Sequence, residues 1–219
     1  MVFLCRVTWF LLVVAGLLHG GDLTAASVLH FATIEEAIAR GDLADVRAHV
    51  AVDPAGATRT GKGGLPLHQA ILRNKTDIAL LLLDSGASVD VPDRTARTPL
   101  HLAVERGNVA LVTALLQRRA RANERDALGW TPLHHGAAEN KVAVVQALLA
   151  GGADAHALSD RGGTPLHEAA ASGGAAMIRL LLDAGVDPKV VSKTGVTALE
   201  IAREYKNEAA ITELSAGTK

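Results

Sequence analysis

The chain has 219 residues, of which 49% are apolar and 21% are charged, a balance typical of a soluble domain or a short repeat array. Its 22 Lys and Arg residues nearly cancel its 23 Asp and Glu residues, so the overall charge gives no attraction to nucleic acid or to an anionic membrane. Aromatic residues make up 3%, and Ala and Leu supply most of the apolar share, which favours closely packed helices over a β-sandwich.

The first thirty residues have the three-part pattern of a secretory signal peptide. Arg6 gives a positive start, Val7 to Leu18 is an apolar run with Thr8 as its one polar residue, and the small residues of Thr24 to Ser27 offer a cleavage site. The apolar run is shorter than the roughly 20 residues that span a bilayer. We therefore expect residues 1–26 to be removed on export and residues 27–219 to form the mature domain. An uncleaved membrane anchor and a buried N-terminal helix are the alternatives.

One motif recurs along the rest of the chain at a spacing of 33 residues. Its copies are Leu65-Pro66-Leu67-His68, Thr98-Pro99-Leu100-His101, Thr131-Pro132-Leu133-His134, Thr164-Pro165-Leu166-His167 and the degenerate Thr197-Ala198-Leu199-Glu200. A Leu-Leu pair recurs in the same register and begins at Leu82, Leu115, Leu148 and Leu181. Ile34, Ala37 and Ile38 extend the register back to a first, imperfect copy. This regular spacing without insertions indicates one structural unit used about six times.

Each unit predicts two short helices. Thr followed by Pro indicates a helix start, because Thr caps free N–H groups and Pro is preset for the first helical position. The first helix is expected to end in a tight turn built on residues that tolerate the left-handed conformation, which are Asn74, Gly107, Asn140 and Gly173. The second helix is expected to end at Gly86, Gly152 and Gly185.

Two residues depart from this pattern. Arg119 stands in register with the helix-ending glycines, so we expect a non-glycine residue in the left-handed conformation there. Gly136 stands inside a first helix, where glycine costs up to about 1 kcal/mol relative to alanine. Asn74-Lys75-Thr76 is an N-glycosylation sequon on an exposed turn, and an unmodified turn asparagine is the alternative.

The repeated unit resembles the ankyrin repeat, a helix–turn–helix–hairpin of 33 residues with the signature Thr-Pro-Leu-His-x-Ala. Thr98 to Ala103 and Thr164 to Ala169 match this signature best. The resemblance implies an all-α repeat solenoid of about six repeats, in which the first and last copies are degenerate caps. The expected repeats are residues 31–58, 60–92, 93–125, 126–158, 159–191 and 192–214.

The same resemblance implies that the chain binds another protein through its concave surface and its turns, and that it is not an enzyme. Family binding residues lie in the turn before Thr-Pro and on the solvent side of the first helix. In this sequence those places hold Lys62, Arg73, Arg94, Arg97, Arg106, Trp130, Glu139, Arg161 and Lys193. The turn residues are mostly cationic, so we expect a partner with an acidic patch. For Trp130 the alternative is that it only covers the neighbouring turn.

Several motifs resemble chemical sites but lack a required part. Gly56 to Gly63 is nearly a phosphate-binding loop, yet it lacks the final Ser or Thr and follows no expected strand. The recurring histidines of stacked helices would lie roughly 8–10 Å apart, too far for one metal ion, and the family resemblance assigns them hydrogen bonds to adjacent turns. The single cysteine, Cys5, lies in the segment expected to be removed. We therefore predict no catalytic, cofactor or metal site. An enzyme with its active site on the turns is the alternative from another class.

Overall fold

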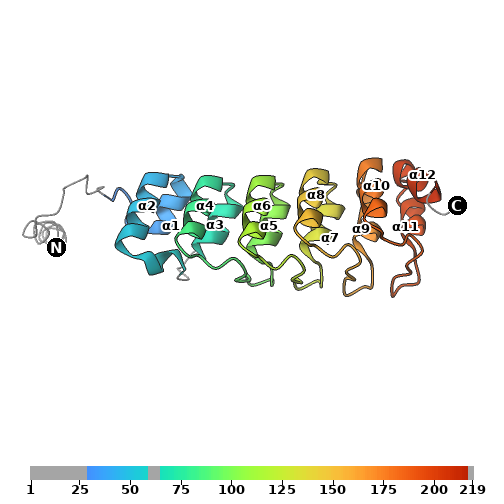
Figure 1. Cartoon of the computed structure of the whole chain (residues 1–219), viewed down its shortest axis with the longest axis horizontal. Helices are drawn as coiled ribbons and strands as arrows, with labels where there is room; N and C mark the ends of the chain where they lie inside the picture. The colour runs from blue at the N-terminus through green and yellow to red at the C-terminus, as the bar shows by residue number, and fades with distance from the viewer. Residues whose placement is uncertain (1–28, 59–64, 217–219) are drawn as a thin grey trace, which may run out of the picture.

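The computed structural model describes residues 29–58 and 65–216, so the expected signal peptide and Lys62 lie outside the described residues. Within these residues, twelve α-helices form six consecutive pairs, and no strand longer than an isolated bridge is present. Figure 1 shows the pairs side by side in one row, with the turns projecting along one edge and the first and last helix pairs at opposite ends of the row. The prediction of an all-α repeat solenoid is confirmed.

The first helices of the pairs are α1 (Ile34–Arg40), α3 (Pro66–Leu72), α5 (Pro99–Glu105), α7 (Pro132–Ala138), α9 (Pro165–Ser172) and α11 (Ala198–Glu204). The second helices are α2 (Leu43–Val52), α4 (Thr76–Asp84), α6 (Val109–Gln117), α8 (Val142–Ala150), α10 (Ala175–Asp183) and α12 (Glu208–Ala216). A short 3₁₀ turn, Pro54–Ala57, follows α2. First helices pack on neighbouring first helices, and second helices pack on second helices. Within residues 29–58 and 65–216, no helix has both the length and the apolar character needed to cross a membrane.

The predicted helix starts are confirmed at the recurring Thr-Pro. Proline is the first helical residue of α3, α5, α7 and α9. In the last three of these helices the preceding Thr has extended backbone angles, as an N-cap residue does, and its hydroxyl lies 2.8 to 3.0 Å from Nδ1 of the histidine three residues later. In α11 a glutamate replaces the histidine, and the backbone N–H of Thr197 donates to Glu200 Oε2 at 2.7 Å.

The core of the row is built from the repeated leucines and small residues. Leu100, Leu133 and Leu166 of the first helices are fully buried, and so are the leucines at the recurring position of the second helices. Gly136 lies against the second helix of its pair, where a Cβ added to it would be only 2.8 Å from Cγ2 of Val145. The glycine that costs helix propensity therefore makes room for a neighbouring methyl group.

The helix ends follow the predicted backbone with one exception. Gly86, Gly152 and Gly185 have φ between 87° and 90°, and Arg119 at the same register has φ 64°. Asn74 and Asn140 have φ 55°, and Gly107 has φ 67°. The left-handed prediction is wrong for Gly173, which is extended with φ −73° and ψ 147°.

The exception at Gly173 has a steric cause. Helix α9 runs one residue further than α5 and α7, so Gly173 itself becomes the C-cap and its N–H donates to the carbonyl of Ala169 at 2.6 Å. A Cβ at Gly173 would lie only 2.6 Å from that carbonyl oxygen. Glycine is required there by close approach and not by a positive φ.

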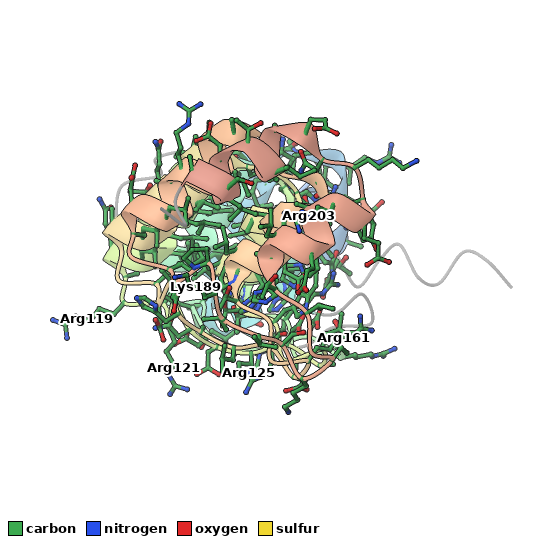
Figure 2. The ribbon with its side chains drawn as sticks, turned by 90° about the vertical axis from the view of Figure 1, so that its right-hand side faces the viewer. Arg119, Arg121, Arg125, Arg161, Lys189 and Arg203 are labelled. Atoms are coloured by element: carbon green, nitrogen blue, oxygen red, sulfur yellow. The ribbon has the colours of Figure 1, made fainter. Side chains whose placement is uncertain are left out.

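We expect Arg119→Gly to raise the free energy of unfolding by about 0.5–1 kcal/mol, because it removes the strain of a side chain in the left-handed region. The Arg119 side chain is exposed and points away from the stack, so little packing is lost (Figure 2). Urea unfolding of both forms measures the difference. The matched control is Gly152→Ala, whose added Cβ meets no atom within 4 Å and which should lower stability through φ alone. An Arg119→Gly variant less stable than the parent would contradict the strain.

Candidate functional site

The projecting turns, here called fingers, are five-residue loops that end directly before the N-cap residue of a first helix. Fingers 3 to 6 are residues 93–97, 126–130, 159–163 and 192–196, numbered by the repeat that they open. In each finger the N–H of the first residue donates to the carbonyl of the last residue at 2.8 to 2.9 Å. Finger 4 also bonds finger 3 (Ala127 N to Thr95 O, 3.0 Å), and finger 6 bonds finger 5 (Lys193 N to Arg161 O, 2.9 Å). The finger backbone is therefore a fixed frame for its side chains.

A histidine clamp attaches each central first helix to the next finger. The backbone N–H of Thr98 donates to Nδ1 of His101 at 3.1 Å, which leaves the ring proton on Nε2, and Nε2–H donates to the carbonyl of Trp130 at 3.1 Å. His134 repeats the arrangement with Thr131 and with the carbonyl of Gly163 at 3.2 Å. The role that the family resemblance implied for these histidines is confirmed at both positions.

The two outer copies of the clamp are less complete. His167 keeps the bond from the N–H of Thr164 at 3.1 Å, but its Nε2 lies toward the carbonyl of Val196 without closing a hydrogen bond. His68 lies three residues after Leu65, which has no hydroxyl, whereas the other copies have Thr at that position. Within the described part of the chain, neither ring nitrogen of His68 makes a hydrogen bond. All four rings are buried, and burial lowers the pKa of each; the pKa of His134 falls to about 4.

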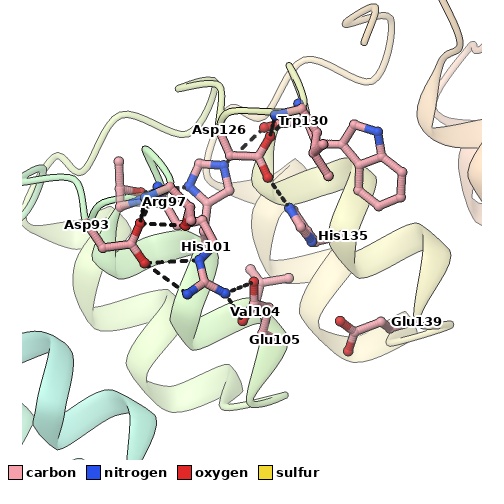
Figure 3. Close-up of polar contacts among 12 residues, drawn as sticks. Asp93, Arg97, His101, Val104, Glu105, Asp126, Trp130, His135 and Glu139 are labelled. Carbon is pink, nitrogen blue, oxygen red and sulfur yellow. Dashed lines mark hydrogen bonds and ion pairs between the residues drawn. The ribbon is translucent and has the colours of Figure 1, made fainter. Parts of the chain in front are cut away.

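Finger 4 is organised by one buried carboxylate. Asp126 accepts hydrogen bonds from the backbone N–H groups of Leu128 and Trp130, both at 2.9 Å, and from Nε2 of His135 at 2.8 Å (Figure 3). The indole of Trp130 stacks on His134 with ring centres 6.2 Å apart and meets the edge of His135 at 5.0 Å. Trp130 is thus held in one position and remains partly exposed.

Finger 3 is organised by an ion-pair network that fixes Arg97. Its guanidinium bonds Asp93 at 2.9 and 3.0 Å and both carboxylate oxygens of Glu105 at 3.0 Å (Figure 3). Although burial acts to raise the pKa of Asp93, the hydrogen bonds from Thr95 and Arg97 hold that pKa at about 2. Arg97, which the sequence analysis gives as a partner contact, also supports its own finger and remains partly exposed.

The other predicted contacts differ in how free they are. Five of the predicted cations have exposed side chains that make no hydrogen bond or ion pair within the described part of the chain: Arg73, Arg94, Arg106, Arg161 and Lys193. Figure 2 shows Arg161 at the edge where the fingers project. Glu139 is exposed but forms an ion pair with Lys141, whose ammonium also donates to the carbonyl of Val104 at 3.2 Å. The structure therefore brings together a row of free cations with one fixed aromatic ring.

Comparison with known families decides the class of the chain. A family model described as ankyrin repeats in three copies matches residues 67–158 and again residues 134–218. The chain belongs to the ankyrin repeat family. The comparison with curated proteins found no match. Ankyrin repeats generally mediate protein–protein interaction, and proteins built from them are typically non-enzymatic binding modules. Within the described residues, no three His, Cys, Asp or Glu side chains gather as metal ligands do.

Sequence reasoning missed the partners that hold the fingers. Asp126 and His135 lie nine residues apart, as do the equivalent positions in every repeat, so a comparison of these two columns would have revealed an acid–base pair in one repeat. Glu105 was also missed as the second partner of Arg97, eight residues away. Each of these pairs can be recognised only by comparing the residue types at two positions of the repeat together. The recurring Thr-Pro-Leu-His motif does not include both positions.

Acid should destabilise the stack through the histidine clamps. A histidine whose pKa is lower in the folded than in the unfolded chain contributes stability that is complete above pH 6.5 and is lost as the pH falls toward the folded pKa. We expect a loss of about 2 kcal/mol or more between pH 7 and pH 4.5, measured by urea unfolding. The stabilisation from Asp93 is lost only below about pH 4, because its pKa falls from 3.8 to about 2 on folding. The variant His134→Gln, whose amide can accept the Thr131 N–H, should lose less on acidification, while exposed His156→Gln should behave as the parent. A stability independent of pH over this range would contradict the clamp.

Proposed function

We propose that the protein is an exported recognition module that binds a partner protein carrying an acidic patch, through the fingers and the adjoining first helices. One observation carries the proposal: the acidic groups of fingers 3 and 4 are bonded within the protein, whereas Arg94, Arg161 and Lys193 are exposed and unpaired in the described structure. The fingers of the nearly neutral chain therefore present free cations to a partner, while the carboxylates of fingers 3 and 4 are engaged in internal bonds.

The finger carboxylates are held by specific bonds. Asp93 is tied to Arg97, Asp126 is tied to His135 and finger amides, and Asp160 pairs with Arg125 at 2.8 Å. These carboxylates are thus engaged in bonds within the protein, and a partner meets the free guanidinium and ammonium groups. Because the charges are exposed, they should speed association and set salt dependence more than they add affinity.

Trp130 supports the same surface. One side of the indole covers His134 and His135, which accounts for the alternative that it only covers the neighbouring turn. The remaining exposed part is an apolar surface whose position is fixed before binding, so a partner would not have to order it. Tryptophan and arginine are the residue types that most often dominate interface energies.

The place of action rests on the N-terminal sequence alone. The positive start, the apolar run and the small residues near Ala26 support export, to the periplasm or as a secreted protein. A membrane-tethered adaptor with an uncleaved anchor is the alternative, and it would present the same fingers from a fixed position.

The partner is to be captured with the immobilised protein and its affinity measured by calorimetry against variants. We expect Trp130→Ala and the double variant Arg94→Ala/Arg161→Ala each to weaken binding by more than about 1 kcal/mol, with affinity falling as salt is added. Arg97 is left intact because it supports finger 3.

The control for this experiment is Arg47→Ala, an exposed cation of α2, which should bind as the parent does. Circular dichroism and urea unfolding check that each variant is folded. Unchanged affinity in both surface variants would move the binding site away from the fingers.

The protein isolated from its natural host should lack roughly its first 26 residues, because the signal peptide is removed during export. Intact-mass measurement and N-terminal sequencing determine the start of the chain. A full-length product that stays with the membrane fraction would favour the tethered adaptor.

A further inference from the structure

The turn between α3 and α4 carries the sequon Asn74-Lys75-Thr76. No Ser or Thr follows two residues after any of the four other asparagines, which are Asn108, Asn123, Asn140 and Asn207. Asn140 stands in the same register as Asn74, has the same φ of 55° and is also exposed, but Val142 stands where Thr76 completes the sequon. The chain thus has one acceptor asparagine and one matched asparagine outside a sequon.

The side-chain amide of Asn74 is held by its oxygen alone. Its Oδ1 accepts a hydrogen bond from Nδ2 of Asn108 at 3.3 Å, and the same nitrogen of Asn108 donates to Oγ1 of Thr76 at 2.6 Å. Nδ2 of Asn74, the atom that carries an N-linked sugar, makes no hydrogen bond within the described residues. The folded turn therefore uses the oxygens of the sequon and leaves its nitrogen unbonded.

A recess on the surface adjoins the sequon. Its volume is about 270 Å³, and it lies between the first and second repeats. Besides Asn74 and Thr76, the recess is lined by Gly41, Leu43, Lys75, Asp77 and Ile78. An N-glycan is bulky and must lie on the surface, so the fold has to accommodate it without displacing a neighbouring repeat. The exposed asparagine, its unbonded nitrogen and the adjoining recess meet this requirement.

We propose that Asn74 is N-glycosylated when the chain passes through a eukaryotic secretory pathway. The proposal rests on the export part of the proposed function, because the glycan is transferred only to chains that enter the lumen of the endoplasmic reticulum. The modification is an amide-linked oligosaccharide on Nδ2 of Asn74, with Thr76 as the hydroxyl residue that the sequon requires.

The glycan would restrict where a partner protein can approach. Asn74 follows the C-terminal end of α3, whereas each finger ends directly before the N-terminal end of a first helix. Arg73, one of the predicted contacts, is next to the glycan and would be covered by it. The free cations Arg94, Arg161 and Lys193 belong to the fingers of later repeats and would stay open. The partner would therefore meet fingers 3 to 6 and not this turn.

The test translates the full chain in vitro with microsomes from the endoplasmic reticulum. We expect a product that is protected from added protease and is heavier by one core glycan, which endoglycosidase H removes. Asn74→Gln and Thr76→Ala should each abolish the mass increase, while Thr76→Ser should keep it because Ser also completes a sequon. Peptide mapping should place the glycan on Asn74 and leave the matched Asn140 unmodified.

The room at the turn is tested with protein secreted from cultured animal cells. Urea unfolding compares the glycosylated parent with the same chain made in the presence of tunicamycin, which blocks synthesis of the glycan. We expect the glycosylated form to be at least as stable, because the nitrogen that carries the sugar forms no bond that would be lost. A glycosylated form of lower stability would contradict the accommodation of the sugar by this turn.

A protease-protected product without a glycan, or a glycan that persists in Asn74→Gln, would overturn the site and leave export standing. A chain that stays outside the microsomes would overturn export and, with it, glycosylation. Failure of the binding surface appears separately, as full partner affinity in Trp130→Ala and in Arg94→Ala/Arg161→Ala.

Discussion

Each helix pair has an apolar surface on two sides. Its own two helices cannot cover these surfaces, so neighbouring pairs must do so. Leu100, Leu133 and Leu166 reach zero exposure because a neighbouring pair stands on each side of them. No repeat can bury its core alone, so the stability of every repeat depends on the registration of its neighbours. The clamps of His101 and His134 stabilise this alignment of neighbouring repeats. Each of the two joins the first helix of one repeat to the backbone of the next finger.

This division separates the residues that hold the row from those that can meet a partner. Backbone bonds and clamps fix the path of each finger whatever side chain it carries at its last position, where arginine, tryptophan, glycine and valine all occur. The backbone frame thus accommodates different side chains at this position, and Arg97 differs from the others in also bracing its own finger through ion pairs. Recognition can then vary along the row from one repeat to the next, as Trp130 and Gly163 illustrate.

The fold could be predicted almost entirely from the sequence, because period, helix caps and left-handed turns each depend on a few adjacent residues. Arg119 is an example, since its register alone predicted its backbone. Gly173 was mispredicted because the length of α9, and not the local residue type, decides where the turn begins. Ala96 has φ 61° at a register where glycine stands in three other fingers, and it was not predicted because alanine itself carries no signal for the left-handed conformation.

The site could be predicted only in outline. Register and family resemblance place the candidate side chains on one surface, but they do not say which charges are already neutralised. Arg94 and Arg97 are three residues apart and look alike in the sequence, yet one is free and the other is held by two carboxylates. That difference depends on side chains from α5 and from the start of the finger, whose distances only the structure provides.

The bonds between fingers are unevenly spaced, and this gives the row a mechanical asymmetry. Backbone hydrogen bonds join finger 3 to finger 4 and finger 5 to finger 6, while among the described residues none joins finger 4 to finger 5. That junction is spanned by side chains, through His134 and through Arg125 with Asp160. A junction without backbone hydrogen bonds has fewer fixed contacts, so we expect it to be the most flexible point along fingers 3 to 6. A change of angle at this junction would alter the distance between finger 4 and finger 5. The surface formed by the fingers would then fit partners of different curvature.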